Sequence, residues 1–146
     1  MRAFLFVLLL SGCTASAGIG GHWASVGPHP HVTFAVKASV GPVELFHSPL
    51  SNARPVTDMT ALTVSHGPTF GPVQIAPLVG MYAGRAWGAC DENGYHCEHT
   101  WVTGLTLGAG LTYRHGPFRA DLQYRAYDGD SPISGGLVFT TGLEIK

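Results

Sequence analysis

Two neighbouring stretches, residues 101–114 (WVTGLTLGAGLTYR) and residues 118–128 (FRADLQYRAYD), decide the fold class of this chain. Apolar residues alternate with polar or small ones in both, so that Leu107 and Thr106 point to opposite faces of an extended strand. Residues 115–117, His-Gly-Pro, lie between them, and Gly followed by Pro favours a tight turn. The two stretches therefore predict a pair of antiparallel strands joined by a short hairpin.

The same unit recurs along the rest of the chain. Gly41-Pro42 and Gly71-Pro72 have flanks similar to those of Gly116-Pro117, and the period of two continues elsewhere. The pattern predicts eight strands, at residues 19–26, 31–40, 43–50, 59–66, 73–87, 100–114, 118–128 and 136–146. An even number of strands keeps both chain ends on one side, with the Gly-Pro turns. The longer connections, at residues 51–58, 88–99 and 129–135, then lie on the other side.

The composition favours a membrane barrel over a soluble sandwich. Charged residues make up only 12 % of the chain, and no apolar run reaches the roughly 18 residues of a spanning helix. The exposed face of a soluble sheet is usually richer in charge than the polar face here. Trp101 and Tyr113 end one outward face, where aromatic girdles belong. We therefore expect an all-β, antiparallel up-and-down transmembrane β-barrel of about eight strands.

The polar face of the strands carries charges of both signs, which suits ion pairing inside a narrow barrel. Six residues are predicted to form this lumen charge network: Lys37, Glu44, Arg119, Asp121, Arg125 and Glu144. Glycine and threonine on the same face let a narrow lumen close, and an eight-stranded barrel is filled by its side chains. A pore is therefore not expected.

The stretch from Trp101 to Lys146 resembles the small eight-stranded outer-membrane proteins, a group that includes OmpX, the membrane domain of OmpA, PagP and PagL. The resemblance lies in the pattern of strands and turns and is closest over the second half of the chain. It implies the outer membrane of a Gram-negative bacterium, with a gene carried by the bacterium itself or by a phage or mobile element. It also implies a monomer whose partners are outer-membrane lipid, lipopolysaccharide and the barrel assembly machinery.

The N-terminus has the three parts of a secretion signal. Arg2 supplies the positive start, residues 3–10 (AFLFVLLL) form a short apolar core, and small residues follow. Ala15-Ser16-Ala17 fits cleavage by signal peptidase before Gly18, which gives a signal peptide over residues 1–17 and a barrel domain over residues 18–146.

A second cleavage site competes with the first. Leu10-Ser11-Gly12-Cys13 looks like a bacterial lipobox, in which the cysteine is lipidated and becomes the first residue. The signal peptide would then cover residues 1–12, and Cys13 would carry a lipid. Both cleavages export the chain beyond the inner membrane, and the sequence leaves the choice between them open.

Export makes the two remaining cysteines, Cys90 and Cys97, candidates for a disulfide. They flank Asp91-Glu92-Asn93-Gly94, and Asn-Gly supports a turn that would bring them together in an oxidising compartment. The alternatives are two free thiols or a zinc site that would add His96 and His99. The spacing fits no standard zinc site, so we expect no metal and no cofactor.

Residues 44–53 (ELFHSPLSNA) contain the best candidate for catalysis. They are similar to the His-x-Ser-Asn-Ala stretch of PagL-type lipid A deacylases, which implies that His47 would activate a serine for ester hydrolysis. Ser51 lies four residues away, about 13 Å along a continuous strand, so Ser48 is the alternative. Glu44 and Asp58 are the nearest acids for a third member.

Three functions remain open. The first is a non-enzymatic outer-membrane barrel with a structural or surface-interaction role through its external loops. The second is a lipid A-modifying ester hydrolase, and the third is a soluble, β-rich periplasmic lipoprotein. The net charge of −1 offers no basic patch for nucleic acid.

Overall fold

The computed structural model describes residues 14–26, 29–49, 56–90, 97–128 and 133–145. These ranges contain nine strands: β1 (Ala15–Val26), β2 (His29–Val40), β3 (Val43–Ser48), β4 (Val56–Ser65), β5 (Thr69–Phe70), β6 (Val73–Cys90), β7 (Cys97–His115), β8 (Phe118–Tyr127) and β9 (Ile133–Ile145). Within them, no helix is long and apolar enough to cross a membrane.

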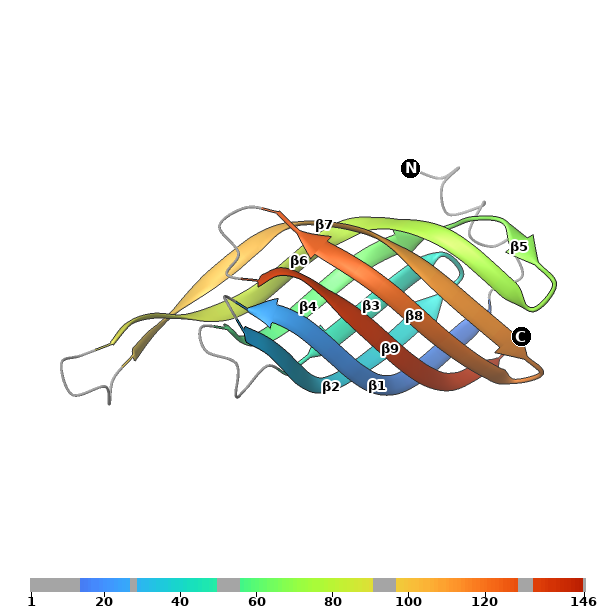
Figure 1. Cartoon of the computed structure of the whole chain (residues 1–146), viewed down its shortest axis with the longest axis horizontal. Coiled ribbons are helices and arrows are strands. Elements are labelled where there is room, and N and C mark those ends of the chain that lie inside the picture. The colour runs from blue at the N-terminus through green and yellow to red at the C-terminus, as the bar shows by residue number, and fades with distance from the viewer. Residues whose placement is uncertain (1–13, 27–28, 50–55, 91–96, 129–132, 146) are drawn as a thin grey trace.

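Eight of the strands close into a barrel (Figure 1). All pairs are antiparallel, and each strand pairs with its neighbour in the chain except at two places. β1 pairs with β9, and β4 pairs with β6 past the two-residue strand β5. The predicted all-β, up-and-down antiparallel barrel is confirmed.

The three Gly-Pro hairpins lie at one end of the barrel, where β1 starts and β9 ends. Gly41, Gly71 and Gly116 have φ of 56°, 60° and 58°, the left-handed region that glycine tolerates best. A glycine in this conformation at the first central position is what a two-residue hairpin of type II′ needs. We call this end the turn end, and the opposite end the loop end.

Side chains alternate across the wall as the sequence predicts. Leu107 is 56 % exposed on the outside, whereas its neighbour Thr106 is fully buried in the lumen. The curvature of the wall brings neighbouring strands so close that an added Cβ at Gly20 would collide with the carbonyl of Phe139. The absence of a side chain at Gly20 therefore lets β1 and β9 approach closely enough for this narrow barrel to close.

The strand boundaries differ from the predicted ones at several places. β1 begins at Ala15 rather than at residue 19, and β4 begins at Val56 rather than at residue 59. β6 and β7 continue to Cys90 and Cys97, beyond the predicted limits at residues 87 and 100. Alternation of apolar and polar residues marks the parts of a strand that form the barrel wall, with one face outward and one toward the lumen. It does not mark the parts of a strand that extend beyond the wall.

Candidate functional site

The lumen at the turn end holds a cluster of buried ion pairs. Lys37 Nζ lies 2.6 Å from Asp121 Oδ2 and 3.1 Å from Glu44 Oε2. Arg119 Nε donates to Asp121 Oδ2 at 2.9 Å. Lys37, Asp121 and Glu44 are each at most 3 % exposed. Each of these charges therefore has a partner of opposite sign within hydrogen-bonding distance, which buried charges require.

Neutral and further charged residues extend the cluster to the rim. Arg119 Nη1 donates to Ser16 Oγ and to Ser39 Oγ, each at 3.0 Å. Arg114 Nε donates to Glu144 Oε2 at 2.8 Å, and Arg114 Nη1 donates to Gln74 Oε1 at 2.9 Å. Arg114 shares the parity of Thr106 on β7 and thus faces inward, but it is not among the six residues predicted for the network.

Arg125 differs from the other predicted network residues. Its guanidinium lies over the ring of Phe46, 4.6 Å from the ring centroid, and its Nη2 donates to Gln123 Oε1 at 2.7 Å. Gln123 Nε2 in turn donates to Glu44 Oε2 at 2.9 Å. Arg125 is thus linked to the carboxylates through Gln123, with a cation–π contact in place of a direct ion pair.

The predicted catalytic residues are not brought together in the described part of the chain. His47 is on the outside of the barrel, where its Nδ1 is 2.9 Å from Thr60 Oγ1. Ser48 and Glu44 point into the lumen, because residues one or three apart on a strand face opposite sides. The wall therefore separates His47 from both, which corrects the idea that Ser48 could replace Ser51. Ser51 lies outside the described residues, and Asp58 pairs with Arg85 at 2.6 Å.

A different histidine meets Ser48 inside the lumen. His22 Nδ1 is 3.1 Å from Ser48 Oγ, and Ser48 Oγ donates to the carbonyl of Phe34 at 3.1 Å. A hydroxyl has one proton, so while Ser48 Oγ donates to the Phe34 carbonyl it can only accept from His22 Nδ1. A general base would have to accept that proton instead. The contact is therefore structural, and both side chains are fully buried.

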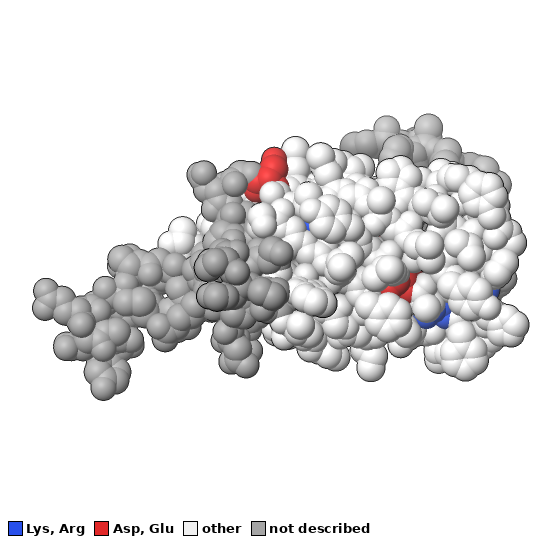
Figure 2. Space-filling model, viewed as in Figure 1, with Lys and Arg blue, Asp and Glu red and all other residues white. Residues whose placement is uncertain are grey.

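The outer wall is a belt of exposed apolar side chains. Leu105, Leu122, Leu137 and Met81 are each 46–65 % exposed. Trp101 lies toward the loop end, and Tyr113 and Phe118 lie toward the turn end. The face of the molecule in Figure 2 shows few charged atoms between the two ends. Charged side chains described on the strands are in the lumen or near a strand end, as with the Arg85–Asp58 pair.

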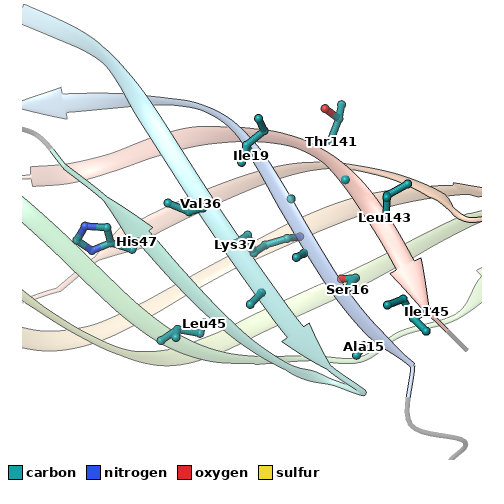
Figure 3. Close-up of a pocket in the computed structure, with 14 residues that line it drawn as sticks. Ala15, Ser16, Ile19, Val36, Lys37, Leu45, His47, Thr141, Leu143 and Ile145 are labelled. Atoms are coloured by element: carbon teal, nitrogen blue, oxygen red, sulfur yellow. The ribbon is translucent and has the colours of Figure 1, made fainter.

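A hollow in this belt lies over the start of β1 (Figure 3). It has a volume of about 660 Å³ and is floored by small residues, including Ala15, Ala17, Gly18 and Ala38. Larger apolar residues flank it, among them Leu45 and Leu143. We call this hollow the β1 groove.

The cysteine pair lies at the far end of the β6–β7 hairpin. Cys90 and Cys97 are directly opposite each other in the strand register. Their side chains are outside the described residues, so the disulfide stays a prediction, and so does the zinc alternative with His96 and His99. Among the described side chains, no three His, Cys, Asp or Glu residues form a group that could hold a metal ion.

Comparisons with known proteins bear on the fold. No protein-family model and no curated protein matches the sequence. The N-terminal β-barrel domain of Pseudomonas aeruginosa OprF matches the structure with a TM-score of 0.64 and 13 % identity, over 91 % of this chain and 97 % of that one.

Two further structures match over similar lengths. The attachment invasion locus protein Ail of Yersinia pestis has a TM-score of 0.55 and 18 % identity, over 91 % of this chain and 97 % of that one. Neisserial surface protein A has a TM-score of 0.55 and 16 % identity, over 93 % and 97 %. The architecture and these matches agree: the chain has the fold of the small eight-stranded outer-membrane β-barrels.

Proposed function

We propose that the chain is a small outer-membrane β-barrel protein with a structural or surface-interaction role, carried by the loops at the loop end. One observation supports this most directly. The wall is apolar outside and polar inside, the reverse of a soluble protein of this size. Among the described residues, 24 large hydrophobic side chains are exposed, whereas soluble monomers rarely expose contiguous apolar patches of more than a few hundred Å².

The lumen is filled by side chains at both ends, which supports a function carried by the outside of the barrel. At the turn end it is occupied by the ion pairs around Lys37 and Asp121, and toward the loop end by buried Phe46, Met59 and Tyr82. Eight-stranded barrels have just enough interior to be filled in this way. A filled lumen argues against a channel, and the separation of His47 from Ser48 removes one version of the hydrolase alternative.

The loops that join the strands at the loop end are then the surface that we propose for binding. Binding residues are disproportionately found on loops held by a rigid scaffold. Two of the similar proteins have names that refer to attachment or to the surface: the attachment invasion locus protein Ail, whose structure is also known in complex with the heparin analogue sucrose octasulfate, and Neisserial surface protein A. For this chain we propose only the general role at the cell surface.

A pair of variants tests the membrane placement. Leu107→Arg places a charge at the middle of the outer wall, where it should cost about 2–4 kcal/mol, and Thr103→Arg on the same face nearer the rim should cost about 0–1 kcal/mol. Heat-modifiable migration on a gel after outer-membrane extraction reports assembly. Wild type and Thr103→Arg should show it, and Leu107→Arg should lose much of it. Equal assembly of both variants would contradict the placement.

Epitope tags test the direction of the barrel. A tag inserted between Asn93 and Gly94 should bind antibody on intact cells, whereas a tag between Gly116 and Pro117 should bind only after permeabilisation. Replacing residues 91–96 with a glycine-serine linker should alter adhesion of the cells and leave heat-modifiable migration unchanged. Labelling of the turn end on intact cells would contradict the proposal.

A further inference from the structure

The start of β1 is built into the barrel wall on both sides. Ala15 pairs with Val40 of β2 and with Ile145 of β9, and Ala17 pairs with Ala38 and Leu143 in the same way. These residues belong to the Ala15-Ser16-Ala17 segment that also fits cleavage by signal peptidase. The same segment therefore has two incompatible roles, as the end of a discarded signal and as part of the wall.

Ser16 adds a lumen contact to this segment. Its Oγ is 2.7 Å from Ser39 Oγ and accepts a hydrogen bond from Arg119 Nη1 at 3.0 Å. Ser16 is only 9 % exposed, and it helps to close the turn end of the lumen beside Arg119. Cleavage after Ala17 would take away one of the two neutral partners of this buried guanidinium.

Loss of the segment would also open the wall. The ends of β2 and β9 would lose their shared neighbour, and the backbone N–H and C=O groups that pair with residues 15–17 would lose those partners. Such groups are costly in hydrocarbon, which is why membrane barrels are closed. The structure therefore favours a cleavage that keeps residues 15–17.

Cleavage before Cys13 keeps them. Thr14, the residue between Cys13 and β1, accepts a hydrogen bond on its carbonyl from Gly41 N at 2.9 Å, at the turn end. A lipid on Cys13 would leave the chain at this end, two residues before Ala15. Ala15 also lines the β1 groove, whose floor of small residues opens on the outer wall (Figure 3). The groove thus offers an apolar seat that reaches the start of β1.

We propose that the chain is a lipid-anchored barrel: Cys13 receives a diacylglyceryl group, the precursor is cleaved before Cys13, and an acyl chain of the anchor lies in the β1 groove. The inference rests on the proposed outer-membrane location, which places the turn end and the groove in the inner leaflet. Three features support it: the Leu10-Ser11-Gly12-Cys13 motif, the place of residues 15–17 in the wall, and the groove that these residues help to line.

The modification is carried out by enzymes of the host in two steps. The Cys13 thiol displaces the head group of a glycerophospholipid: a bond forms between Sγ and the terminal glycerol carbon, and the bond from that carbon to the phosphate oxygen breaks. The thiol proton leaves with the head-group phosphate. Water then hydrolyses the Gly12–Cys13 peptide bond, which leaves a carboxylate on Gly12 and a free α-amine on Cys13.

The test uses the full chain expressed in a Gram-negative host fed with an alkynyl palmitate. The purified protein should carry the label, and mass spectrometry should find a mature N-terminus at Cys13 with a diacylglyceryl thioether. Cys13→Ala should lose the label, and Cys97→Ala, the matched cysteine control, should keep it. Ala17→Leu blocks cleavage after Ala17 and should leave both the label and the N-terminus unchanged.

An unlabelled protein, with its N-terminus at Gly18 or at Met1, would overturn the inference. Heat-modifiable migration separates this failure from that of the proposed function. A folded barrel without lipid would refute only the anchor. A labelled protein that is recovered without heat-modifiable migration would refute the barrel's membrane placement and with it the seat in the groove.

Discussion

The two ends of the lumen are stabilised in different ways. At the turn end, Lys37, Asp121 and Arg119 form direct ion pairs, and hydroxyl and amide side chains complete their hydrogen bonds. Toward the loop end, the interior is apolar and aromatic, with Tyr82 and Tyr127 in an edge-on contact at 5.2 Å. Ion pairs therefore stabilise the turn end, and the packing of apolar and aromatic side chains stabilises the lumen toward the loop end.

Buried polar atoms without a hydrogen-bond partner among the described residues occur at both ends. Toward the loop end they are His22 Nε2, Arg125 Nη1 and Tyr127 OH. Among the turn-end charges they are the hydroxyls of Thr63 and Thr140, and Lys37 Nζ, which has its ion pairs. Buried polar groups that are satisfied make a structure sensitive to their loss, whereas removing an unsatisfied one costs little. Substitutions at the turn end should therefore depend on charge and hydrogen bonding, and those toward the loop end on volume.

The largest effect is expected for Lys37→Met. It leaves the buried carboxylates of Asp121 and Glu44 without their shared cation and should lower the free energy of unfolding by about 3–5 kcal/mol. Urea unfolding in phospholipid vesicles, followed by tryptophan fluorescence, measures it. The control is Arg85→Met in the exposed pair with Asp58, where the loss should be about 0–1 kcal/mol. If both variants lost the same free energy of unfolding, the larger contribution expected of the buried pairs would be contradicted.

Met59→Ala tests the apolar end. Met59 is 1 % exposed and packs in the cluster with Phe46 and Tyr82, so truncation leaves a cavity and should cost about 2–5 kcal/mol in the same unfolding assay. Met59→Leu keeps most of the volume and should cost less than about 1.5 kcal/mol. If both variants lost the same free energy of unfolding, side-chain volume would not be what stabilises the lumen toward the loop end.

Two threonines on β7 compare the ends within one strand. Thr112 Oγ1 donates to Asp121 Oδ1 near the turn end, whereas Thr106 Oγ1 has no described partner farther along the lumen. Thr112→Val should cost about 1.5–3 kcal/mol, because the hydrogen bond is to a charged group. Thr106→Val should be close to neutral. The reverse order in urea unfolding would contradict the contrast between the ends.

The smallest effect is expected for Tyr127→Phe. The Tyr127 hydroxyl is buried and has no hydrogen-bond partner among the described residues, so its removal should leave stability unchanged or raise it slightly. The midpoint of urea unfolding measures the change. A clear loss of stability would mean that the hydroxyl has a partner, such as an ordered water in the lumen.

Alternation predicted which side of the wall the residues of 31–40, 101–114, 118–128 and 137–146 face, and the burial of the described residues in these stretches agrees. It could not predict which inward residues meet, because that depends on the stagger between strands around the barrel. Arg125 faces inward as predicted, yet its height along the barrel places it over Phe46 rather than beside a carboxylate. Arg114, on the same inward face, reaches Glu144.

Other differences come from sequence motifs that fit two structures. Ala15-Ser16-Ala17 has the small residues that signal peptidase recognises, and the same small residues line the β1 groove on the outer wall. The comparison of His47 with Ser48 shows the limit of linear motifs in a strand. Two residues that are adjacent in sequence lie on opposite sides of the wall, one toward Thr60 and one toward His22.

The β6–β7 hairpin extends beyond the rest of the barrel at the loop end (Figure 1). The pairing of β4 with β6 ends at Ala86 and that of β8 with β7 ends at Thr106, whereas β6 and β7 continue together to Cys90 and Cys97. A two-stranded ribbon has marginal stability alone. Its outer amides should therefore exchange hydrogen through local fraying, long before the barrel opens. A covalent link between Cys90 and Cys97 would restrain this fraying without changing the barrel below it.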